Sequence, residues 1–185
     1  MTKKLILLSI LGILFSISGF AQDDEEINII RNQFSEINKG VGYTQSTPHL
    51  ADDDCHFTIE IKKKGNEIRM IELRRVEDTR GYTYQYYYWD GEPFFIFTQN
   101  DINEGENEEG VLTFRHYEYR HYFSGYQCIR SLYRGFRYTD KEPNVKSIEF
   151  MDYFKAYDER DRAEKILDYA EKGQWDKICG MNIPI

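Results

Sequence analysis

The sequence has 185 residues, with 24 Lys and Arg against 32 Asp and Glu and a formal net charge of −8. The length suits a single domain with its own core. The excess of negative charge would repel a polyanion, which argues against a protein that binds nucleic acid.

Residues 1–21 have the pattern of a cleavable export signal. Lys3 and Lys4 precede an apolar run over residues 5–17, and the segment ends at the small residue Ala21. The apolar run is shorter than the roughly 20 residues that a membrane-spanning helix needs. We therefore expect cleavage after Ala21, no transmembrane segment in the remaining chain, and a protein that is periplasmic or secreted.

Cleavage would leave residues 22–185 as one domain that is rich in aromatic side chains. Of the 2 Trp, 15 Tyr and 12 Phe, only Phe15 and Phe20 belong to the signal. Burying a tyrosine ring removes roughly 200 Å² from water, which stabilises by about 5 kcal/mol. Stranding its hydroxyl costs only about 1–3 kcal/mol. We expect a thin sheet with a one-sided aromatic core and phenol groups at its margins.

The first predicted element is a helix over residues 22–40, with acidic residues at its N-terminal end and Gly40 placed to end it. Residues 41–54 show no period and are predicted to be a connecting loop. The apolar face of the helix consists of Ile27, Ile30, Phe34 and Ile37.

A period of two over residues 56–134 predicts three antiparallel hairpins. Their turns are expected at Lys64-Gly65-Asn66, at Asp90-Gly91, whose residues tolerate positive φ, and at Ser124-Gly125. The acidic segment 100–110 between the last two hairpins is predicted to be a long solvated loop. The predicted strand pairs are 56–63 with 67–75, 82–89 with 94–99, and 113–123 with 127–134.

After the hairpins, Ile148 and Phe150 permit a short seventh strand. A second helix is predicted from Asp158 to Lys172, capped by Asp158 and ended by Gly173. Its apolar stripe consists of Ala163, Ile166, Leu167 and Ala170, and Trp175, Ile178 and Ile183 are expected to pack the tail onto the body.

The predicted fold is an α+β domain with a six- or seven-stranded antiparallel meander sheet. We expect the N-terminal and C-terminal helices to pack on one face of that sheet. Cys55, Cys128 and Cys179 all lie in the exported portion, where disulfides form. They allow one bridge with three choices of partner, or none.

The sequence carries no nucleophile elbow, phosphate loop, zinc-type cysteine pairs or His-Glu-x-x-His helix, so we assign no catalytic residue and no cofactor. Cys128 and His121 could face each other across the third hairpin as nucleophile and base, although a strand cysteine more often packs or forms a disulfide. His116 and His121 belong to opposite faces of a strand, which disfavours a metal site.

Asp101, Asn103, Gly105 and Asn107 superficially resemble a calcium loop. The EF-hand pattern requires glycine at the sixth position and an acidic residue at the twelfth. Because Glu106 and Leu112 stand there instead, we assign no metal site to the segment.

Arginines are interleaved with tyrosines over residues 115–138, a stretch that contains five arginines and a single carboxylate, Glu118. Forked hydrogen bonds and ring stacking suit the recognition of an anionic or planar group, and tyrosine also suits protein interfaces. The alternative is that the arginines lie over tyrosine rings and pair with carboxylates elsewhere in the chain. The candidate ligand-binding residues are Arg115, Tyr117, Arg120, Arg130, Tyr133 and Arg134.

The favoured interpretation is an exported, non-catalytic binding or interaction module for a protein, glycan or anionic ligand. One alternative is a small hydrolase-like enzyme, in which His116, His121, Cys128 or a pair of carboxylates would converge in a cleft. Another is an inhibitor or immunity-type protein whose acidic segment 101–109 docks on a basic partner.

Overall fold

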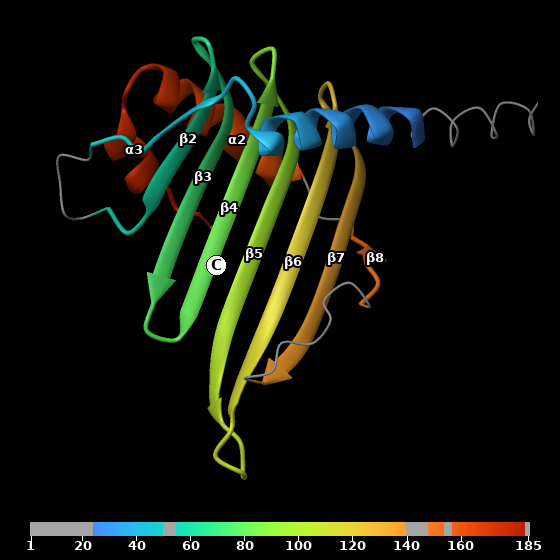
Figure 1. The fold of residues 1–185 in the computed structure, drawn as a ribbon, viewed down its shortest axis with the longest axis vertical. Coiled ribbons are helices and arrows are strands. Elements are labelled where there is room, and N and C mark those ends of the chain that lie inside the picture. Colours follow the sequence, from blue (N-terminus) through green and yellow to red (C-terminus); the bar gives the residue numbers. More distant parts are fainter. Residues whose placement is uncertain (1–23, 50–54, 140–147, 154–156, 184–185) are drawn as a thin grey trace, which may run out of the picture.

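The computed structural model describes residues 24–49, 55–139, 148–153 and 157–183. These residues form an α+β architecture in which eight antiparallel strands follow one another across the sheet in chain order, with helices before and after them (Figure 1). The expected export signal and its cleavage site lie outside the described residues.

The N-terminal helix covers residues 24–39, α2 covers Tyr157–Glu171 and α3 covers Trp175–Cys179. The strands are β1 (Thr44–Ser46), β2 (Thr58–Lys64), β3 (Glu67–Glu77), β4 (Arg80–Trp89), β5 (Glu92–Glu106), β6 (Leu112–Ser124), β7 (Gln127–Thr139) and β8 (Met151–Asp152).

The antiparallel meander and all three hairpins are confirmed. Asp90 and Gly91 form the β4–β5 turn with φ values of 52° and 80°, as the Asp-Gly pair predicts. The strand count of six or seven is wrong because β1 extends the sheet inside the segment 41–54, which we expected to be a loop. Three exposed residues are too few to show a period, and main-chain pairing with β2 alone defines this strand.

The acidic segment 100–110 is also not the long loop that its composition predicts. Strand β5 continues to Glu106 and pairs with β6 as far as Leu112. The turn that remains is closed by Asn107, whose Oδ1 accepts hydrogen bonds from the amides of Glu109 and Val111 at 3.0 Å each. The composition was misleading because two carboxylates of this segment pair with neighbouring strands, Asp101 with His116 and Glu104 with Arg115 and Arg137.

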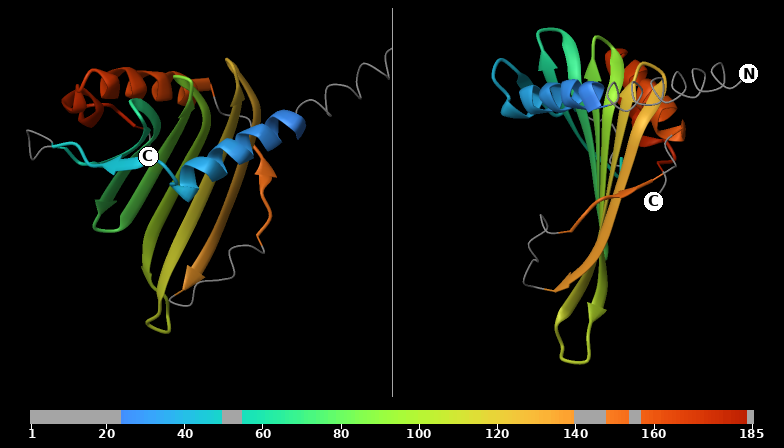
Figure 2. Two further views of the ribbon diagram at one scale, coloured as in Figure 1. Left: turned by 45° about the horizontal axis from the view of Figure 1, so that its top comes forward. Right: turned by 90° about the vertical axis from the view of Figure 1, so that its right-hand side faces the viewer.

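The two terminal helices lie on opposite faces of the sheet, so the expectation of a one-sided sheet is wrong (Figure 2). The N-terminal helix packs on what we call the front face, where its apolar stripe meets Tyr87, Phe95 and Tyr122. Helix α2 packs on the back face against alternate tyrosines of β4. Each face therefore has its own core, and aromatic rings contribute to both.

The back-face core explains how β4 buries its tyrosines. Tyr82, Tyr84, Tyr86 and Tyr88 all point to this face and are at most 4% exposed. The hydroxyl of Tyr88 donates to the carbonyl of Ala163 in α2 at 2.9 Å. This hydrogen bond offsets the cost of burying the hydroxyl.

A disulfide joins Cys55, just before β2, to Cys179 at the end of α3. Cys128 is free. The bridge ties the end of the chain to the early strands, and Ile178 and Ile183 pack beside it as predicted. Within the described residues, we find no helix with both the length and the apolar character needed to cross a membrane.

Candidate functional site

The register of β6 and β7 divides the six candidate binding residues between the two faces of the sheet. Successive strand residues point to opposite faces, and the cross-strand pairs are Glu118 with Arg134, Tyr122 with Arg130, and Tyr119 with Tyr133. Three candidates lie on the front face and three on the back face, so the set does not form one surface. The front group is Arg120, Arg130 and Arg134, and the back group is Arg115, Tyr117 and Tyr133.

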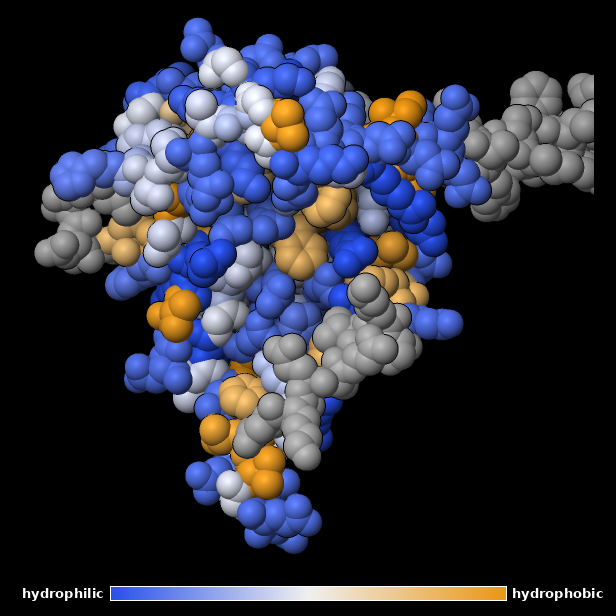
Figure 3. Space-filling view, viewed as in Figure 1, coloured by the Kyte–Doolittle hydropathy of each residue, from blue (hydrophilic) through white to orange (hydrophobic). Residues whose placement is uncertain are grey.

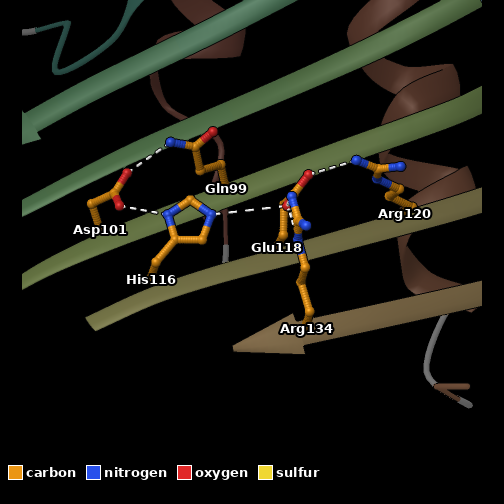
Figure 4. A network of polar contacts seen from close by, with 6 residues as sticks. All are labelled: Gln99, Asp101, His116, Glu118, Arg120 and Arg134. Atoms are coloured by element: carbon orange, nitrogen blue, oxygen red, sulfur yellow. Dashed lines mark hydrogen bonds and ion pairs between the residues drawn. The ribbon is translucent and has the colours of Figure 1, made fainter. Parts of the chain in front are cut away.

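The front face carries a polar network centred on Glu118, which is only 4% exposed (Figure 4). Its Oε1 accepts a hydrogen bond from Nη2 of Arg120 at 2.9 Å. Its Oε2 accepts hydrogen bonds from the guanidinium of Arg134 on the next strand. A carboxylate that is removed from water needs such partners, and here two arginines share one carboxylate.

The network continues along the front face to a second acidic group. Asp101 Oδ1 lies 2.6 Å from Nδ1 of His116, and Nε2 of Gln99 donates to Asp101 Oδ2 at 2.8 Å. Burial alone would raise the pKa of Asp101, but the hydrogen bonds from His116 and Gln99 outweigh it and hold this pKa below its ordinary value. Asp101 is therefore a charged structural partner of His116.

Phe150 lies over both arginines of this network. The Cζ atoms of Arg120 and Arg134 are 4.2 and 4.4 Å from the centre of its ring, which is cation–π geometry. Buried Nε of Arg120 has no hydrogen-bond partner among the described residues. Arg120 thus retains one unused donor beside the buried carboxylate.

Arg120 and Glu118 contribute to a cavity of about 410 Å³ between the N-terminal helix and the front face, which we call the helix cleft. In Figure 3 apolar groups are visible below the N-terminal helix, next to strongly hydrophilic ones. This volume lies within the roughly 300–1,000 Å³ of small-molecule sites. Its polar lining residues are Arg31, Gln85, Glu118 and Arg120, and its apolar ones are Ile30, Phe34, Phe95, Phe97, Tyr122, Leu132 and Phe150.

On the back face the arginines are matched by partners. Arg115 and Arg137 both pair with Glu104, and Arg115 also donates to the hydroxyl of Tyr117 at 3.1 Å. The ring of Tyr133 lies 5.0 Å from that of Tyr119. The alternative that arginines pair with the acidic part of the chain is confirmed for this face.

The groups considered for catalysis lie on different faces. His121 and Cys128 are on the back face and are joined through Ser131, whose Oγ is 2.9 Å from His121 Nδ1 and 3.2 Å from Cys128 Sγ. His121 is 3% exposed, and burial lowers its pKa. His116 points to the front face, so the opposite placement of the two histidines is confirmed and they do not converge.

Two side chains of the calcium-like segment already bind groups of the protein itself through their oxygens. Asn103 Oδ1 accepts a hydrogen bond from the amide of Gly105 at 2.9 Å, and Asp101 contacts His116. Across the described ranges, no group of three or more His, Cys, Asp or Glu side chains is placed to hold a metal ion.

Comparison of the chain with known protein families, with curated proteins and with solved structures found no match. The geometry of the site is therefore the basis for a functional proposal. Alternation along β6 places His116, Glu118 and Arg120 on one face, but it does not identify the cleft. Arg31 and Phe150 were missed because neither is near β6 in sequence, and no local pattern places them there.

Proposed function

We propose that the protein is an exported, non-catalytic binding module that takes an anionic ligand in the helix cleft. The observation that carries this proposal is the side chain of Arg120, which lines the cleft and is one-third exposed, and whose Nε has no hydrogen-bond partner among the described residues. Arg120 and Arg134 share the carboxylate of Glu118, and Arg31 lines the cleft from the N-terminal helix. Forked, charge-assisted hydrogen bonds from arginine are strong and suit carboxylate, sulfonate or phosphate groups.

Two further observations support parts of this proposal. The size of the cleft fits a small molecule better than a protein or a long glycan. The Cys55–Cys179 disulfide is of the kind that persists in oxidising compartments, which favours an exported protein. The possible nucleophile, Cys128, lies with His121 on the other face of the sheet, so it does not contribute chemistry to the cleft.

The test uses the anionic fluorophore 1-anilinonaphthalene-8-sulfonate, titrated against the native protein and three variants. We expect one molecule to bind per chain, with affinity reduced at least about ten-fold by Arg120→Met. Arg31→Met should weaken binding as well, and because Arg31 is exposed on the helix surface, this variant should fold normally.

Arg115→Met is the matched control, because Arg115 lies on the back face and pairs with Glu104. Its affinity for the fluorophore should equal that of the native protein. Absence of binding, or equal binding by all three variants, would overturn the proposal.

A further inference from the structure

The interior of the helix cleft is mainly apolar, although charged groups stand at its wall. Seven of the eleven lining residues are aromatic or aliphatic. The rings of Phe34 and Phe95 are 5.2 Å apart, and those of Phe95 and Tyr122 are 5.0 Å apart. This packing forms a continuous aromatic floor that spans the helix and two strands.

The polar lining residues differ in how many of their groups are already engaged. Gln85 donates to Glu72 at 2.6 Å and accepts from the hydroxyl of Tyr87 at 2.9 Å. Glu118 is paired with both strand arginines. The Nε of Arg120 has no partner in the part of the chain that the structure describes, and Arg31 makes a 3.5 Å hydrogen bond to Asn28 on its own helix. The unused capacity of the cleft is therefore cationic and donates hydrogen bonds.

An apolar floor and a cationic wall in one cavity select a ligand that has both characters. A small inorganic anion would satisfy Arg120 and leave the aromatic floor in contact with water. A neutral hydrocarbon would cover the floor and would take the exposed part of the Arg120 side chain out of water without offering it a hydrogen bond, which is unfavourable. A molecule with an anionic head and an apolar body satisfies both requirements.

We infer that the ligand is a monomeric anionic amphiphile, an inference that rests on the proposed function. Its carboxylate, sulfate or phosphate head binds Arg120 and Arg31, and its alkyl or aryl body lies on the aromatic floor formed by Phe34, Phe95 and Tyr122. A free fatty acid and an acidic lipid share this chemistry. The bounded volume of about 410 Å³ favours the single free molecule over a membrane surface.

The inference is tested by calorimetric titration with acetate, hexanoate, octanoate and decanoate, each below its micelle concentration. We expect affinity to rise about four-fold for each methylene that is buried, and thus about fifteen-fold from octanoate to decanoate. Octan-1-ol, which has the same chain without the charge, should bind at least about ten-fold more weakly than octanoate.

Two variants separate the contributions of head and body. Arg31→Met should weaken octanoate binding and leave octan-1-ol binding unchanged, because it removes only a cation. Leu132→Ser should weaken the binding of both, because it removes part of the apolar lining, while Arg115→Met should change neither. A thermal melt of each variant checks that the fold is retained.

The outcomes distinguish this inference from the proposed function. Equal affinity for acetate and decanoate, with the fluorophore still bound at the cleft, would overturn the amphiphile and leave an anion-binding module. Sedimentation of the protein with vesicles of anionic phospholipid, without binding of free decanoate, would overturn the choice of a monomeric ligand. Failure of both the fluorophore and the carboxylates to bind would overturn both proposals.

Discussion

Removal of the Cys55–Cys179 disulfide should destabilise the protein by an amount that follows from its place in the chain. The bridge joins residues separated by 124 positions. In the chain-entropy description, a crosslink over that separation lowers the entropy of the unfolded chain by about 16 cal/mol/K, which corresponds to about 5 kcal/mol at 25 °C. Since whole domains are stable by about 5–15 kcal/mol, this is a large part of the total.

The perturbation is the double variant Cys55→Ser with Cys179→Ser, and the assay is equilibrium unfolding in urea followed by circular dichroism. With a slope of about 2 kcal/mol per M, the midpoint should fall by about 2.5 M. The slope itself should rise, because the unfolded chain without the crosslink exposes more surface. The free energies of unfolding should therefore be compared together with the midpoints.

Cys128→Ser is the matched control, because it also replaces a cysteine but leaves the bridge intact. The Sγ of Cys128 lies near Ser131, and serine preserves a similar size and a hydrogen-bonding group, so the change should be within about 1 kcal/mol. The reasoning would be refuted if the double variant lost less than about 1 kcal/mol, or if thiol labelling of the unreduced native protein after unfolding found the free cysteine at a position other than 128.

Three further changes test the packing and the charges. Glu118→Gln should destabilise the protein by about 3 kcal/mol in urea unfolding. This is the lower end of the range for a broken buried ion pair, because one of the two arginine partners of Glu118 is one-third exposed. Glu108 is exposed, so Glu108→Gln should have almost no effect, and equal losses in the two variants would contradict this assignment. The folded-state pKa of His121 lies below the usual 6.5, so the unfolded chain binds a proton more readily than the folded protein, and stability falls as the pH drops below about 6.5. His121→Asn should reduce this dependence of the unfolding free energy on pH between about pH 7 and pH 5. An unchanged pH dependence would refute the assignment. Gly135→Ala should cost about 1–3 kcal/mol in a thermal melt, since its Cβ would stand 2.4 Å from the hydroxyl of Tyr133; no loss of stability would show that this ring moves freely.

The two long helices and the three hairpins were predictable from the sequence because the signals that define them are local. The apolar stripe Ile27, Ile30, Phe34 and Ile37 repeats within one helix, and Asp90-Gly91 specifies its turn through the φ values of two adjacent residues. The composition of segment 100–110 was misleading because Asp101 and Glu104 pair with side chains on other strands.

The candidate site was only partly predictable. Alternation along one strand places Glu118 and Arg120 on the same face. The abundance of arginine near residue 118 correctly indicated β6 and β7 as the strands that contribute to the site. The same abundance grouped residues that the pleat separates, such as Arg115 and Arg120, which the structure places on opposite faces. A period of two predicts which residues of a strand share a face of the sheet, but it does not predict which face a distant helix will cover.

The amino-acid sequence by itself determined the two long helices, the meander of the three hairpins between them, and the excess of aromatic and acidic residues. Tertiary structure alone decided that the terminal helices cover opposite faces, that Cys55 pairs with Cys179, and that Arg31 and Phe150 meet Arg120 around one cleft. The physical reason is the distance along the chain over which each effect acts. Backbone geometry and side-chain periodicity act over a few residues, whereas cores, disulfides and clefts depend on which distant surfaces bury one another.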